Sequence, residues 1–308
     1  MISRPLLILS ASRVPLHTLR PMGTAMSAMS HVALADAAIQ FACFTVAAAL
    51  QTEKFYDISA SLTYILCILI SRKGGVRSTR SKVNSTLVVL WALRLGSFLL
   101  WRVLHDGGDS RFAKAKTKPL TFLIFWAIQA LWIFITALPV YLGNTRTRLS
   151  KTSSEIEEGT EVPSPPSADR DPERPRRDLP VCWRDVVGWS LWTLGFVVQF
   201  TADVQKRIFT ADPRNANRWI NVGLWRWAQH PNYFGEMCMW WGIFLSCSAS
   251  FRNWELLTVL CPCFVTFLLL KVSGVPILRR NGLKRWGHLP EYQEYIRKTP
   301  LLLPLPRG

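Results

Sequence analysis

The feature that most constrains this chain is a series of apolar runs, each close to the length of a membrane span. A helix needs about 20 residues to cross roughly 30 Å of hydrocarbon. The runs of this length are Val32–Leu50, Val83–Leu104, Leu120–Leu142, Trp183–Ala202, Asn232–Ser250 and Leu256–Val275, and a shorter seventh run is Ile58–Ile70. The sequence therefore predicts an all-α polytopic transmembrane helical bundle with six to seven spans.

The composition agrees with a membrane protein. A soluble helical protein would struggle to bury a chain that is 49% hydrophobic, and many of the 14 tryptophans lie near the ends of the apolar runs, where indole rings favour the membrane interface. The seven cysteines lie inside or at the edge of these runs without the spacing of a zinc site. We expect packed thiols and no metal.

The net charge of +17 comes from basic residues spread over the loops and tails. This distribution favours anionic lipid headgroups or a phosphorylated cofactor as partners, and not nucleic acid. Basic residues both precede and follow the run Val83–Leu104, so charge bias leaves the membrane orientation open.

The chain divides into four parts. Residues 1–31 form a basic tail without Asp or Glu, which is either an ordinary disordered tail or a transit-like segment. Residues 32–142 hold the N-terminal transmembrane helices. Residues 143–180 are rich in Ser, Thr, Pro, Glu and Arg and predict a disordered polar loop. Residues 181–308 form a C-terminal transmembrane region with most of the polar motifs.

One polar cluster lies at the mouth of the run Asn232–Ser250. It contains His230, Asn232, Tyr233 and Glu236 within WINVGLWRWAQHPNYFGEMCMWW. Pro231 suits the first position of a helix, whose free backbone donors can bind an anion. Polar groups at this depth favour a binding site; a loop-to-membrane junction with aromatic anchors is the alternative.

A second polar cluster follows the run Trp183–Ala202 and contains Asp203, Gln205, Lys206 and Arg207. The loop between the two clusters is too short to cross a bilayer, so both lie on one side and are predicted to share a site. The alternative is a charged interfacial helix end, which is common.

Two arginines lie on one face of the run Val83–Leu104. Arg94 is in its interior, where an arginine seldom faces lipid, and a functional role and a structural ion pair are equally compatible with that position. Arg102 is nearer the interface and could extend to it.

The chain resembles the steroid 5-alpha-reductase-like membrane proteins of the DUF1295 group. The resemblance rests on GLWRWAQHPNYFGEMCMWWG, ADVQKRIF and LWALRLGSFLLWR with a following DSRF, supported by EKFYD, SLTYI and VSGVPIL. It implies about seven helices, NADPH as cofactor, and reduction of a carbon–carbon double bond in a sterol-like or other lipid substrate.

The resemblance also implies roles for residues. Asp203, Arg207, Asn232 and Glu236 would contact the cofactor, flanked by Gln205, Lys206, His230 and Tyr233, with Arg94 and Arg102 near its phosphates. Many members have Arg before His-Pro-Asn-Tyr, where this chain has Gln229. That departure weakens a phosphate role there and leaves the preference for NADPH over NADH open.

The proton donor of such a reaction is not identified by the motifs. Tyr56 and Asp57 are the catalytic candidates, because they begin the run Ile58–Ile70 and a carboxyl kept partly out of water can donate a proton. Capping of that helix is the alternative role.

Two other functions stay open. Membrane S-adenosylmethionine-dependent methyltransferases share a similar His-Pro and Glu signature, and a non-catalytic lipid-binding membrane protein could keep the same fold. The oligomeric state is not indicated. The resemblance points to the endoplasmic reticulum, and the acid-free N-terminal stretch leaves a mitochondrial or plastid membrane open.

Overall fold

The computed structural model describes residues 22–73, 78–106, 108, 112–145 and 180–303, and this part of the chain is helical throughout, without a strand. The helices are α1 (Met22–Ala49), α2 (Tyr56–Ser71), α3 (Thr79–Asp106), α4 (Pro119–Asn144), α5 (Trp183–Ala211), α6 (Leu224–Trp227), α7 (Pro231–Ser248), α8 (Leu260–Phe267), α9 (Val275–Trp286) and α10 (Pro290–Lys298). Of the predicted basic tail, residues 1–21 lie outside the described residues, whereas residues 22–31 form the start of α1, ten residues before the predicted start of the first apolar run. Most of the predicted polar loop also lies outside the described residues.

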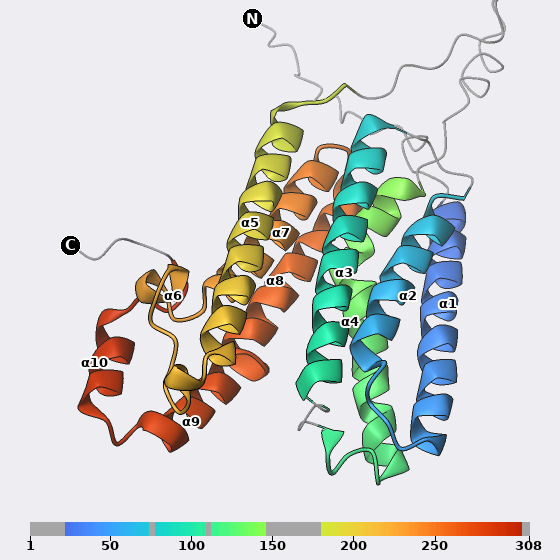
Figure 1. Ribbon diagram of the computed structural model, residues 1–308. Coiled ribbons are helices and arrows are strands. Elements are labelled where there is room, and N and C mark those ends of the chain that lie inside the picture. The colour runs from blue at the N-terminus through green and yellow to red at the C-terminus, as the bar shows by residue number, and fades with distance from the viewer. Residues whose placement is uncertain (1–21, 74–77, 107, 109–111, 146–179, 304–308) are drawn as a thin grey trace, which may run out of the picture.

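The long helices run alongside one another as a bundle (Figure 1). Helices α1, α2 and α4 pack together, α3 packs on α2, and α5 pairs with α7. At one end of the bundle lie α6, α9 and α10 together with the α1–α2 connection; α3 and α5 begin at the other end. The chain is thus an all-α helical bundle, as predicted.

Four helical segments are long and apolar enough to cross a membrane. They are Met26–Ala49 in α1, Thr79–His105 in α3, Pro119–Asn144 (α4), and Asn253–Trp286, which takes in α8 and α9. The other three expected spans correspond to α2, α5 and α7. Helix α2 has only 16 residues, while α5 and α7 carry several of the polar side chains described below. Polar and ionisable residues lower the hydropathy of a helix even where it packs inside a bundle.

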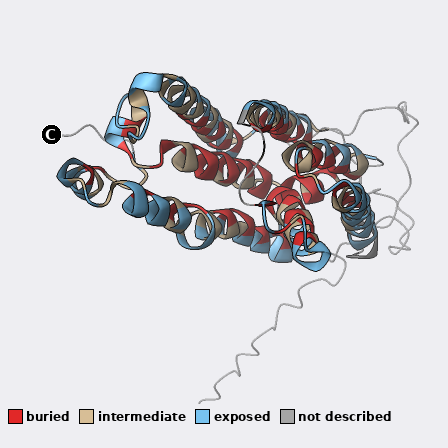
Figure 2. Ribbon diagram, turned by 60° about the horizontal axis from the view of Figure 1, so that its bottom comes forward, coloured by how far each residue is buried: buried red, intermediate tan, exposed pale blue. Residues whose placement is uncertain are grey.

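The outer faces of the bundle are apolar. Leu34, Phe41, Leu120 and Leu260 are all more than 60% exposed, whereas buried residues follow the inner faces of the helices (Figure 2). Exposed apolar surface on this scale indicates contact with lipid, so the helices insert into a membrane.

Helices α5 and α7 approach closely because glycines face glycines. A Cβ added at Gly188 would lie 2.5 Å from the carbonyl oxygen of Gly242, and one added at Gly195 would lie 2.5 Å from that of Gly235. The two pairs are spaced equally along each helix, as an antiparallel pair requires. Small residues let membrane helices come into backbone contact, and this fixes the register of α5 against α7.

A buried ion pair ties α3 to α5 at the end where both helices begin. Arg80 donates from Nε and Nη2 to the two carboxylate oxygens of Asp185, each at 2.6 Å. Asp185 also accepts from the Ser246 hydroxyl at 2.9 Å and from the Cys182 backbone N–H at 2.9 Å. Sequence reasoning did not single out this pair.

Candidate functional site

A second Arg–Asp pair joins the same two helices farther along. Arg94 of α3 donates from Nη1 to Asp203 of α5 at 2.6 Å, and both side chains are 11% exposed. The Nη2 of Arg94 donates to the side-chain oxygen of Gln199, one turn before Asp203. Arg94 is therefore turned toward α5 and away from lipid, in a part-buried ion pair.

The two predicted polar clusters meet at this ion pair. Asn232, in the first turn of α7, donates from Nδ2 to the other oxygen of Asp203 at 3.4 Å. Pro231 begins α7 as expected, and the α5–α7 packing places this turn beside the end of α5. Segments separated by the loop and α6 thus form one polar network.

Glu236 extends the network into the core. This carboxylate is 7% exposed and accepts from the indole N–H groups of Trp91 at 3.1 Å and Trp240 at 2.7 Å. The side-chain amide of Gln199 donates to the same carboxylate. Gln199 therefore connects Glu236 to Arg94.

Gln199, Trp91 and Trp240 were missed in the sequence. Their signal is helical spacing: Gln199 lies four residues before Asp203, Trp91 three before Arg94, and Trp240 four after Glu236. Residues at these spacings share a helix face with the motif residue.

Several buried polar atoms of the network have no hydrogen-bond partner within the described residues. They are the Nε of Arg94 and the Oδ1 of Asn232, and the Nδ1 of His230, two residues before Asn232, is also unpaired. Buried polar groups are normally paired. Donors and an acceptor left unpaired in one region are suited to a polar ligand.

His230 immediately precedes the first residue of α7, and its side chain makes no capping hydrogen bond. Its ring stacks on Tyr233 with the centroids 5.4 Å apart, and the side chain is largely buried. Burial, helped by the positive charges of Lys206 and Arg279, lowers the pKa of His230 to about 4. The imidazole is therefore neutral at physiological pH.

The basic residues near the end of α5 lie against aromatic rings. The Lys206 ammonium is 5.2 Å from the ring centroid of Trp225, and the Arg207 guanidinium is 4.1 Å from that of Trp101. Burial lowers the pKa of Lys206. The side-chain oxygen of Gln205 accepts from the backbone N–H of Leu224 at 2.8 Å, so Gln205 holds the start of α6.

The two candidate proton donors have separate surroundings. Asp57 lies 3.7 Å from Arg102, and this pair joins α2 to the end of α3. The positive charge of Arg102 also contributes to lowering the pKa of Lys206. Tyr56 instead packs on Phe112 and Trp126, and its hydroxyl donates to the Phe125 carbonyl at 2.8 Å. Asp57 thus pairs with α3, whereas Tyr56 faces α4.

A cavity of about 300 Å³ opens between α3 and α5. Arg94 and Asp203 lie on its wall together with Ser97, Trp101 and Phe200. The ion pair is therefore reachable by a ligand. The apolar part of the wall would suit a molecule that also carries non-polar groups.

These features define a helical integral membrane protein with a ligand-accessible polar network among α3, α5 and α7. The chain belongs to the DUF1295 family, described as proteins of unknown function and known as steroid 5-alpha-reductase-like membrane proteins, whose model matches residues 43–156 and 171–299. No significant match was found among curated proteins or among solved structures.

Proposed function

We propose that this protein is a membrane-embedded NADPH-dependent reductase of a carbon–carbon double bond in a sterol-like or other lipid substrate. The observation that carries the proposal is the Arg94–Asp203–Asn232 network, with unpaired buried polar atoms on Arg94, Asn232 and His230. Such a set offers guanidinium, imidazole and amide contacts to a charged, polar cofactor. Membership of a steroid 5-alpha-reductase-like family supports the same reading.

In this proposal the residues divide by charge. Arg94, Arg102, Lys206 and Arg207 supply positive charge for phosphate groups. Asn232 and Glu236, with Asp203, bind the uncharged polar parts, while Gln205 and Tyr233 hold the surrounding loop and helix start. The cofactor would supply hydride. The indole N–H groups of Trp91 and Trp240 fix the Glu236 carboxylate in one orientation.

Reduction of a polarised alkene also requires a proton or a hydrogen-bond donor for the developing negative charge. Of the two candidates, Asp57 pairs with Arg102 at 3.7 Å, so its carboxylate would have to leave this pair and take up a proton before it could donate one. Tyr56 remains a candidate, although its hydroxyl hydrogen is directed to Phe125.

The experiment is a binding titration of the purified, detergent-solubilised protein with NADPH, followed by fluorescence. Asn232→Ala and Glu236→Ala should weaken binding, while Asn215→Ala, in the loop after α5, should leave it unchanged. Comparison of lipid extracts with and without the protein then identifies the substrate. Tight binding of S-adenosylmethionine without binding of NADPH would reject the reductase in favour of a methyltransferase. Binding of neither ligand would favour a lipid-binding protein.

For the location, the proposal is the endoplasmic reticulum membrane. Imaging of a fluorescent fusion with and without residues 1–21, which precede α1, tests it. Transfer of the full-length fusion to mitochondria or plastids would contradict it.

A further inference from the structure

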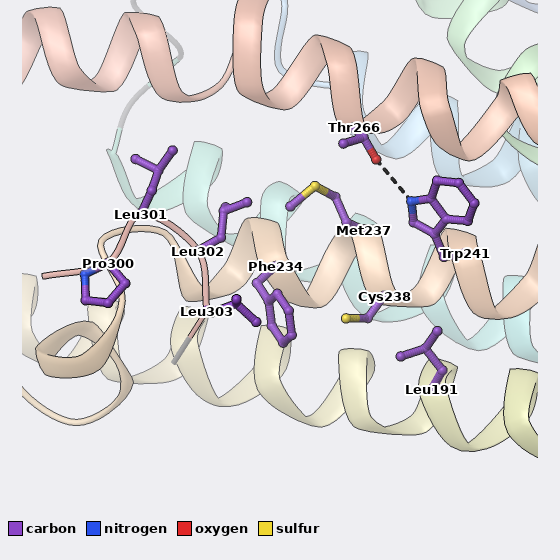
Figure 3. Close-up of a pocket in the computed structure, with 10 residues that line it drawn as sticks. All are labelled: Leu191, Phe234, Met237, Cys238, Trp241, Thr266, Pro300, Leu301, Leu302 and Leu303. Carbon is purple, nitrogen blue, oxygen red and sulfur yellow. Dashed lines mark hydrogen bonds between the residues drawn. The ribbon is translucent and has the colours of Figure 1, made fainter. Parts of the chain in front are cut away.

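An apolar groove of about 540 Å³ lies on the other side of α7 from the polar network. Leu191 of α5, Phe234 and Met237 of α7, and Leu301–Leu303 after α10 form most of its wall (Figure 3). The hydroxyl of Thr266, also in the wall, is occupied: it accepts from the Trp241 indole at 3.2 Å and donates to the Pro262 carbonyl at 2.8 Å. The groove therefore favours hydrocarbon.

Gln229 holds one wall of this groove in place through hydrogen bonds to the end of α10 and the segment after it. Its side-chain amide donates to the carbonyls of Ile296 at 2.9 Å and Thr299 at 2.7 Å, and its backbone N–H donates to Pro300 at 2.9 Å. The His230 backbone N–H donates to Leu301 at 3.0 Å. Irregular backbone is tolerated beside lipid only when its polar groups are satisfied. Gln229 thus holds the leucine segment in place against α7.

The end of the groove near Leu301 adjoins His230 and two basic residues. Lys206 and Arg279 lie close enough to His230 for their charges to lower its pKa, and His230 is bonded to Leu301. Arg279 is exposed at the start of α9. An apolar groove with cations at one end matches a molecule that has a hydrocarbon chain and an anionic head.

The groove borders the candidate span Asn253–Trp286 through Thr266, and Leu303 at its rim is 53% exposed. We propose that the groove binds one acyl chain of an anionic membrane phospholipid, with the phosphate beside Arg279. The bilayer supplies this occupant, and the basic loops of the chain complement its charge. The apolar wall of the groove and the polar network lie on different faces of α7, and Arg279 has no role in the reductase proposal.

The test uses the full chain in nanodiscs of phosphatidylcholine containing a small fraction of phosphatidylglycerol with a diazirine in one acyl chain. After irradiation, mass spectrometry should find adducts on Phe234–Trp241 and on Pro300–Leu303. Leu303→Trp should reduce them several-fold by filling the groove. Leu131→Trp is the matched control, since Leu131 lies on the outer face of α4 and is also 53% exposed.

A second pair of variants tests the head group. Arg279→Gln should reduce labelling by the phosphatidylglycerol probe, whereas Arg280→Gln, on the neighbouring exposed arginine, should not. Labelling of the groove no greater than that of α4, or equal labelling by a phosphatidylcholine probe, would overturn the proposal. Size-exclusion profiles establish that every variant is folded.

Discussion

Helices α3 and α5 are joined by two Arg–Asp pairs, one buried and one part-buried, that differ in how completely their atoms are bonded. The Arg80–Asp185 pair is bidentate, Asp185 is fully buried, and Ser246 and Cys182 occupy its remaining acceptor sites. The Arg94–Asp203 pair has a single direct contact, both side chains are 11% exposed, and the Nε of Arg94 is unpaired.

This difference separates a structural pair from a binding pair. A saturated buried pair has no capacity for a ligand, and removing one partner leaves an uncompensated charge. A pair with unused donors beside a cavity can bind a ligand at small structural cost. The same residue types therefore serve stability at one end of α5 and binding at the other.

The largest effect is expected at the saturated pair. Asp185→Ala should lower the free energy of unfolding by about 3–5 kcal/mol, because Arg80 is left buried without its partner. Thermal unfolding in detergent measures the loss. Glu294→Ala, which removes the exposed ion pair with Lys298, should cost less than about 1 kcal/mol. Equal losses in the two variants would remove the distinction between the pairs.

At the other end of α5, the pH dependence of the free energy of unfolding should reflect the burial of His230. Its pKa is about 4 in the folded protein against 6.5 in the unfolded chain, so protonation favours unfolding. Stability should be highest above pH 6.5, fall by about 3 kcal/mol as the pH drops to 4, and then level off. His230→Phe should flatten the pH profile of unfolding, and His288→Gln, at an exposed site, should not. A slope that survives His230→Phe would assign it to other groups.

The Arg94–Asp203 pair, in which the Nε of Arg94 is unpaired, should affect ligand affinity. Arg94→Gln should weaken NADPH affinity by about 10–100-fold, the value of one charged hydrogen bond, while costing less stability than Asp185→Ala. Titration and thermal unfolding of the same preparation give both numbers. An Arg94→Gln protein with full affinity and a large loss of stability would make this pair structural like the first.

The smallest effect is expected between the two pairs, where α5 and α7 are in contact. Gly195→Ala would put a Cβ 2.5 Å from the Gly235 carbonyl oxygen and should cost about 1–3 kcal/mol by overpacking. Gly143→Ala is the matched control, because no atom lies within 4 Å of its added Cβ. If helix separation also moves Asn232 away from Asp203, NADPH affinity falls together with stability in Gly195→Ala alone.

Much of the site followed from the sequence. The short loop after α5 placed Asp203 and Asn232 on one side of the membrane, and the structure brings them within 3.4 Å. The interior position of Arg94 left a functional role and a structural ion pair open, and the structure pairs Arg94 with Asp203. The contribution of Gln199, Trp91 and Trp240 was not predicted, because neutral polar and aromatic residues in apolar runs carry no charge signal.

The role of Gln229 shows the limit of a motif. Its departure from arginine indicated a weaker phosphate site, but its hydrogen bonds to Ile296 and Thr299 could be seen only after the chain had folded. The distinction between the two Arg–Asp pairs is of the same kind.

The sequence by itself determined the helical membrane architecture, since the length and hydrophobicity of each run are local properties that set what a bilayer will accept. Tertiary structure alone decided that Arg80 pairs with Asp185 through two hydrogen bonds and that the Nε of Arg94 is unpaired. It also decided that Gln229 holds the leucine segment after α10 against α7. Those outcomes depend on contacts between helices distant in the chain, above all on the glycine register of α5 against α7.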